Sequence, residues 1–263
     1  MRSAPEGLVA APATPNPFVP GDREHPWQNP HIGTIPQAAG FGYSERDRMM
    51  IRSAFEDRNR TPMDRTFGQP ASRFLLWVDA VGGYWVCLDD EVVLGQPCAA
   101  GRIDVPILGD VSGRHARIRR DSEGYLIEPL RDVKVDGRRV QQAALLHDGS
   151  KIQLGEAVRL VFRRPHALSA TARLEFLSHH RTHPTTDAVL LMAEACVLGP
   201  KPHSHVLCRD WPHEVILYRH EGELYCRTRG DFEIDGIGYR GRGPIHHNAH
   251  VVGDVFSFSL EAI

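Results

Sequence analysis

The fold is decided by three short pieces of sequence that follow one another: Val92-Val93-Leu94-Gly95-Gln96, then Ser112-Gly113-Arg114-His115, then Asp136-Gly137. The first is an apolar run that ends in a Gly-containing turn, and the second leads into an alternating segment, His115 to Arg119. Such alternation indicates a strand with one buried face, and Asp-Gly is a preferred tight turn between strands. Many short strands separated by turns of this kind are typical of a β-sandwich.

The order and spacing of these pieces resemble a forkhead-associated (FHA) domain over about residues 72–164. The resemblance implies a β-sandwich whose loops bind phosphothreonine on partner proteins. It implies that Ser112 contacts the phosphate. It also implies that Gly95, His115 and Asp136-Gly137 are structural residues of the loops, with His115 as the residue that braces them.

The sequence departs from the family pattern at two loop positions. Gln96 stands where the family has an Arg that contacts phosphate, so hydrogen-bond donors remain but the positive charge does not. Arg131 stands where the family has an Asn that holds the peptide backbone. A phosphothreonine carries about −1.5 to −2 charges, and Arg114, Arg131 or Arg102 could supply the missing cation.

We therefore predict a phosphopeptide-binding site that consists of Ser112, Arg114, Gln96 and Arg131. The alternative is that these side chains are solvated loop residues that do not converge on one ligand. The sequence leaves both interpretations open.

A second copy of the pattern follows the first, with offsets of 98 to 104 residues between equivalent positions. The matching pairs are Arg73–Leu76 with Arg173–Phe176, Val92–Gln96 with Cys196–Pro200, His115–Ile118 with His213–Ile216, Glu123-Gly124 with Glu221-Gly222, and Asp136-Gly137 with Asp235-Gly236. Because every landmark keeps its order, a duplicated domain is indicated. We predict an all-β chain with two FHA-like β-sandwiches in tandem, at residues 71–165 and 169–263.

The second predicted domain is degenerate at its loops. Pro200 stands at the position of the first-loop Arg and offers no N–H donor, and Asp210 stands at the position of the Ser. We therefore expect a packing domain or a protein-binding surface there. Trp211 and Tyr239, if exposed, would be natural anchors for a partner.

Residues 1–70 differ in character from the rest. Eight prolines fall within residues 1–40, a density that predicts a disordered tail. Residues 44–57 predict one short helix with an apolar face that includes Met50, Ile51 and Phe55. Thr61 and Thr66 in this region are candidates for a phosphosite that the chain's own FHA domain binds.

Composition excludes several classes of function. The 263 residues carry 31 Lys+Arg and 33 Asp+Glu, a net charge of −2, so no general basic field attracts nucleic acid or a membrane surface. No apolar run is long enough to cross a bilayer, and the N-terminal apolar run is too short for a secretory signal. Five cysteines without Cys-x-x-Cys spacing fit reduced thiols. We expect a cytoplasmic protein.

Histidines are the main source of a rival hypothesis. His179-His180 with His183, His203 with His205, and His246-His247 with His250 could suggest a metal-dependent enzyme, but they lack the cysteine or carboxylate spacing of a structural zinc site. We therefore predict no metal, no cofactor and no catalytic residues. The leading interpretation is a non-enzymatic adaptor that binds phosphorylated protein. The alternative is a phosphorylation-independent interaction scaffold on the same fold.

Overall fold

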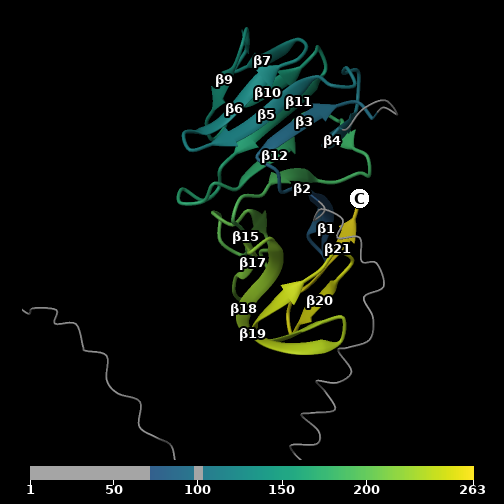
Figure 1. The fold of residues 1–263 in the computed structure, drawn as a ribbon, viewed down its shortest axis with the longest axis vertical. Coiled ribbons are helices and arrows are strands. Elements are labelled where there is room, and N and C mark those ends of the chain that lie inside the picture. Colours follow the sequence, from purple (N-terminus) through teal and green to yellow (C-terminus); the bar gives the residue numbers. More distant parts are fainter. Residues whose placement is uncertain (1–71, 98–102) are drawn as a thin grey trace, which may run out of the picture. The chain divides into compact units, whose positions relative to one another are not determined.

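The computed structural model describes residues 72–97 and 103–263 (Figure 1). Within these ranges every helix-or-strand element is a β-strand, which confirms the predicted all-β class. The predicted tail and helix of residues 1–70, together with Thr61, Thr66 and Arg102, lie outside the described residues.

The strands, in chain order, are β1 (Arg73–Val78), β2 (Gly82–Cys87), β3 (Glu91–Gly95), β4 (Val105–Leu108), β5 (Ala116–Asp121), β6 (Gly124–Pro129), β7 (Val133–Val135), β8 (Arg138–Arg139), β9 (Ala144–Leu146), β10 (Lys151–Leu154), β11 (Val158–Arg163), β12 (Ala172–Phe176), β13 (Arg181–Thr182), β14 (Ala188–Leu191), β15 (Ala195–Gly199), β16 (Val206–Leu207), β17 (Val215–His220), β18 (Glu223–Ile234), β19 (Ile237–Ile245), β20 (His250–Gly253) and β21 (Ser257–Ala262).

The first sandwich packs two sheets around one apolar core. One sheet has the order β13-β4-β3-β5-β6-β9, and the other contains β14-β12-β11-β10-β7-β8. Alternate residues of both sheets point inward, so Leu94 and Ile118 of one sheet and Ile152 and Phe162 of the other are fully buried. The period of two that the sequence shows in β11 follows from this packing.

The second sandwich is built from strands β15 to β21 together with β1, β2 and β14. Strand β18 pairs with β17 near its start and with β20 near its end, and its register against β19 shifts between Arg227 and Asp231. Bulges of this kind bend a strand and let it pass from one sheet into another. The core of this sandwich includes Phe74, Leu217 and Phe258.

Three strands are shared by the two cores. In β1, Leu75 belongs to the first core while Phe74 and Leu76 belong to the second. Strand β14 behaves in the same way, with Leu191 in the first core and Leu190 in the second. A strand buried on both faces has no polar side, which explains why β1, β2 and β14 are nearly continuous apolar runs.

The two predicted repeats exchange their first strands. Strand β1 lies beside β21, the last strand of the second repeat, and β12 lies beside β11, the last strand of the first (Figure 1). The registers are equivalent, with Phe74 opposite Ala262 and Leu174 opposite Phe162. Strands β2 and β14 join the two halves in parallel. The sheet therefore runs across the predicted boundary at residues 165–169, and the sandwiches do not separate there.

The two Asp-Gly turns that the sequence matched to each other have nearly the same backbone conformation. Asp136 and Gly137 have φ values of 50° and 79°, and Asp235 and Gly236 have 51° and 78°. Two positive φ values in a two-residue loop define the mirror-image turn that matches the twist of paired strands. The Asp136 carboxylate accepts a hydrogen bond from the Lys151 N–H at 2.8 Å, and the Asp235 carboxylate accepts one from the His250 N–H at 2.9 Å.

Strand register corrects one detail of the repeat. Leu94 lies opposite Ala116 in the first sandwich, and Leu198 lies opposite Val215 in the second. Since Leu198 is the equivalent of Leu94, the equivalent of His115 is Glu214. The sequence match of His115 with His213 was wrong by one residue, because the loop before β17 differs in length from the loop before β5.

Candidate functional site

The side chain of His115 joins two loops at one end of the first sandwich. Its ring is buried, with 4% of the residue exposed. The Ser112 N–H donates to Nδ1 at 3.1 Å, and Nε2 lies 2.8 Å from the carbonyl oxygen of Asp132. Because Nδ1 accepts, the neutral ring carries its proton on Nε2 and donates it to Asp132. The His115 carbonyl in turn accepts from the Arg131 N–H at 2.9 Å. A single side chain thus fixes the loops that precede β5 and β7.

The loop after β3 is attached to the same assembly through backbone groups. The Gln96 N–H donates to the Ser112 carbonyl at 3.0 Å. Gly95 makes this approach possible, because a Cβ atom added there would lie 2.0 Å from the Gly113 carbonyl oxygen. Any other residue would force the two loops apart. The requirement for glycine at this position is therefore one of space.

The four predicted binding residues all lie on these joined loops. Gln96, Arg114 and Arg131 are exposed, and Ser112 is half-buried. The Arg131 guanidinium donates to the carbonyl of Leu130 at 3.0 Å. The structure brings the backbones of the predicted site together, and the exposed side chains extend from that common base.

Asp132 is the residue of this assembly that the sequence did not indicate. Its carbonyl accepts from His115 and from the Gly155 N–H at 3.0 Å, and its carboxylate pairs with Arg139 at 3.0 Å. The loop is therefore held at several points beside Arg131. A backbone carbonyl has no signature in sequence, so this role could not be read from residue type.

The thiols of the described residues are not activated. Cys196, Cys208 and Cys226 are buried, and desolvation raises the pKa of each to about 12. Burial likewise raises the pKa of Cys87. A protonated thiol is a poor nucleophile, so these cysteines act as small core residues. Among residues 72–97 and 103–263, no group of three or more His, Cys, Asp or Glu side chains is arranged to hold a metal ion.

Trp211 and Tyr239, named from the sequence as partner anchors if exposed, are not fully exposed in the structure. Trp211 is 7% exposed and packs against Phe256, with ring centroids 5.4 Å apart. It belongs to the second core, so it is not an exposed anchor. Tyr239 is half-buried and stacks on Phe232. An aromatic residue next to a loop can be exposed or buried. For Trp211, packing against the β20–β21 hairpin buries the ring.

Comparison with known proteins identifies the first sandwich. Residues 92–155 match the family model of the FHA domain, a segment that begins within β3 and ends just after β10. The chain therefore contains an FHA domain, which is a protein-interaction module. No curated protein matches the chain. In the described part of the chain, no helix is long and apolar enough to span a membrane.

Several solved structures are similar to parts of the chain. The FHA-2 domain from the Mycobacterium tuberculosis ABC transporter Rv1747 shows 26% identity over 34% of this chain and 76% of that chain, with a TM-score of 0.25. The Rv0020c FHA structure shows 27% identity over 34% of this chain and 90% of that chain, with a TM-score of 0.22. The N-terminal FHA domain from EssC, a component of the bacterial type VII secretion apparatus, shows 11% identity over 72% of this chain and 92% of that chain, with a TM-score of 0.20.

Proposed function

We propose that the FHA domain of this chain binds phosphothreonine-containing segments of partner proteins, and that the chain is a non-enzymatic adaptor in the cytoplasm. The observation that carries the proposal is that three loops are held together. The His115 ring joins two of them and the Gln96–Ser112 backbone hydrogen bond attaches the third, so that Ser112, Gln96 and Arg131 lie on joined backbones. Loops fixed in this way lose little entropy when a ligand orders their side chains. The partner would be the substrate of a Ser/Thr kinase.

The charge required for phosphate would come from guanidinium groups on two sides of the site. Arg114 precedes the bracing histidine directly, and Arg131 follows the strand that pairs with β5. A guanidinium fork matches phosphate oxygens and binds them more strongly than a neutral donor does. Gln96 and the Ser112 hydroxyl would add neutral hydrogen bonds. This arrangement would replace the family's first-loop Arg by cations from other loops.

The test is a titration of residues 70–263 with a phosphothreonine peptide library and the same library without phosphate. We expect phosphate-dependent binding that weakens about tenfold or more in Ser112→Ala and in Arg131→Ala, the scale of one hydrogen bond to a charged group. Gln96→Arg is expected to strengthen binding by a similar factor, since it restores the family's cation. Ser122→Ala and Arg240→Ala, both exposed and away from these loops, are the matched controls.

Equal binding of phosphorylated and unphosphorylated peptides would refute the proposal. It would leave a phosphorylation-independent interaction scaffold on the FHA fold. Equal losses of peptide affinity in Ser112→Ala and in its control Ser122→Ala would show that Ser112 is not a binding residue.

A further inference from the structure

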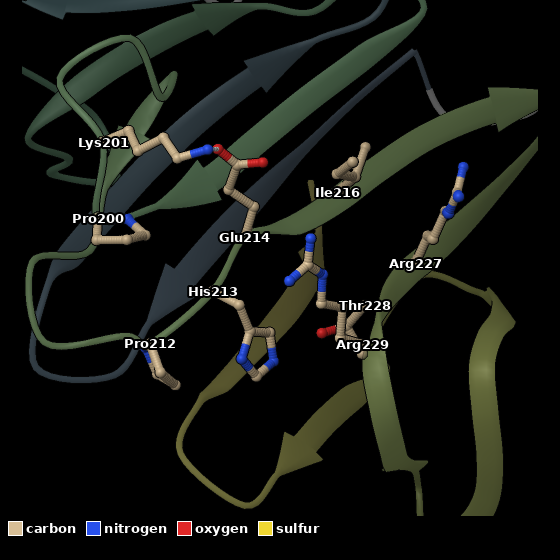
Figure 2. Close-up of a pocket in the computed structure, with 9 residues that line it drawn as sticks. All are labelled: Pro200, Lys201, Pro212, His213, Glu214, Ile216, Arg227, Thr228 and Arg229. Carbon is tan, nitrogen blue, oxygen red and sulfur yellow. Dashed lines mark ion pairs between the residues drawn. The ribbon is translucent and has the colours of Figure 1, made fainter.

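The second sandwich contains a pocket of about 430 Å³ at the end of the sandwich where β15, β17 and β18 meet (Figure 2). It is lined by Pro200, Lys201, Pro212, His213, Glu214, Ile216, Arg227, Thr228 and Arg229. Three of its side chains are cationic (Lys201, Arg227 and Arg229) and one is anionic (Glu214). This pocket lies apart from the loops around His115 and is not used in the proposed function.

The pocket differs from the FHA loops because of the residue that replaces the bracing histidine. At the position of His115, the second repeat has Glu214, whose carboxylate turns to the Lys201 ammonium at 3.0 Å. Figure 2 shows this pair at one side of the pocket. The ion pair and the nearby Arg229 lower the pKa of Glu214, Lys201 being the larger cause. Glu214 is therefore an anion that the pocket already neutralises.

Thr228 is the first sign that this pocket binds a ligand. The residue is 8% exposed and lines the pocket, yet its buried hydroxyl has no hydrogen-bond partner among the described residues. A buried hydroxyl without a partner costs free energy, and such groups are rare in folded proteins. A ligand oxygen in the pocket would satisfy it.

The placement of arginines is the second sign. Arg227 lies directly opposite Arg242 in the β18–β19 ladder, an arrangement in which like charges repel. Arg229 sits in the irregular stretch that follows, next to Gly230 with φ of 99°. Within residues 72–97 and 103–263, no carboxylate forms an ion pair with any of these three arginines. Their combined charge therefore remains available to an anion.

We propose that this pocket binds an acidic peptide segment of a partner protein, with one Asp or Glu carboxylate held by Arg229 and the Thr228 hydroxyl. Neighbouring acidic residues of the segment would lie along Arg227 and Arg242. A carboxylate fits better than a phosphate, because Pro200 and Pro212 supply no N–H donors for the additional oxygens of a phosphate. The second sandwich would thus add a contact of its own to whatever the FHA domain binds.

The test uses the full chain and three fluorescent peptides of equal length. One is rich in Glu and Asp, one carries Gln and Asn at the same positions, and one carries a phosphothreonine in the neutral background. We expect the acidic peptide to bind at least about tenfold more tightly than the amide peptide, with affinity that falls as salt rises. Arg229→Gln is expected to weaken binding about tenfold. Thr228→Val, which replaces the hydroxyl by a methyl group, is expected to weaken it less.

The controls separate this pocket from the FHA loops and from general charge effects. Arg240→Gln removes an exposed cation of the same hairpin outside the pocket and is expected to leave affinity within twofold. Ser112→Ala is expected to leave the acidic peptide unaffected. Equal binding of the acidic and amide peptides, or equal effects of Arg229→Gln and Arg240→Gln, would overturn the proposal. Tighter binding of the phosphothreonine peptide that depends on Arg229 would overturn the carboxylate assignment and give the pocket to phosphate.

Discussion

Leu76, in the first described strand, lies directly opposite Leu260, in the last. The equivalent contact in the other half joins β11 to β12, with Leu160 opposite Phe176. Each repeat thus lends its first strand to the other. The consequence is that neither sandwich has a complete sheet made from its own repeat alone.

The first prediction is that residues 71–165 do not fold independently. This fragment lacks β12 and β14, which would leave β11 as an unpaired edge and expose apolar residues such as Leu160 and Phe162. Exposed apolar edges of this kind promote aggregation. We expect a poorly dispersed NMR spectrum and no cooperative thermal transition for 71–165, against a single cooperative transition for 71–263. A well-dispersed, monomeric 71–165 would show that β1 can return to pair with β11.

Much of the fold could be predicted from sequence, because the strands and Asp-Gly turns follow local rules. The exchange of strands could not. Strands β1 and β12 have equivalent registers against β21 and β11, so either pairing buries the same residues, and hydrophobic pattern does not distinguish them. One signal was available: the continuous apolar runs of β1, β2 and β14 indicate burial on both faces, which a free-standing sandwich with one solvated face does not require.

Part of the candidate site could be predicted from the sequence and part could not. The spacing of Ser112 and His115 indicates the bracing interaction, since a histidine three residues after the loop serine can reach its backbone. The contribution of Asp132 is a carbonyl oxygen, which any residue type could supply. The place of Glu214 beside the second pocket could not be read from the sequence, because the sequence match pairs His115 with His213 and only the strand register shows that Glu214 is its equivalent.

The second prediction concerns the bracing ring. His115→Ala would leave the Ser112 N–H and an Asp132 carbonyl lone pair without their partner in a buried setting. We expect a loss of about 2 to 3 kcal/mol in the free energy of unfolding, measured by urea denaturation. His213→Ala, half-exposed in the second sandwich, is the matched control and should change stability by less than about 0.5 kcal/mol. Equal effects would mean that His115 does not hold the loops.

The third prediction tests the close approach at the first loop. Gly95→Ala would place a Cβ atom 2.0 Å from the Gly113 carbonyl oxygen, so the loops must separate. We expect a loss of about 1 to 3 kcal/mol in stability, the range for overpacked sites. Gly238→Ala is the control, because a Cβ there would meet no atom within 4 Å and its backbone does not need a positive φ. Thermal unfolding would be measured for both variants. Similar melting temperatures for Gly95→Ala and Gly238→Ala would contradict the prediction.

The fourth prediction is a loss of stability in mild acid that depends on His205. This ring is 1% exposed, and its Nδ1 accepts a hydrogen bond from the Val197 N–H at 2.9 Å. Burial, with a smaller contribution from His166, lowers the pKa of His205 to about 4. The unfolded chain binds the proton near the ordinary pKa of about 6.5. The contribution of the neutral ring to the free energy of unfolding is therefore fully present above pH 6.5. It is lost as the pH falls from 6.5 toward 4, by up to about 3 kcal/mol.

The variant that tests this is His205→Asn, which keeps an acceptor for Val197 but does not titrate. The first repeat provides the precedent, since the carboxylate of Asp104 accepts from the Val93 N–H at 2.9 Å. We expect the difference in urea midpoint between pH 7 and pH 4.5 to be smaller in His205→Asn than in the wild type. It should not vanish, because burial also lowers the pKa of His247. Identical pH dependence in both proteins would show that protonation of His205 does not limit stability, and that this ring finds a partner for its second proton when it becomes charged.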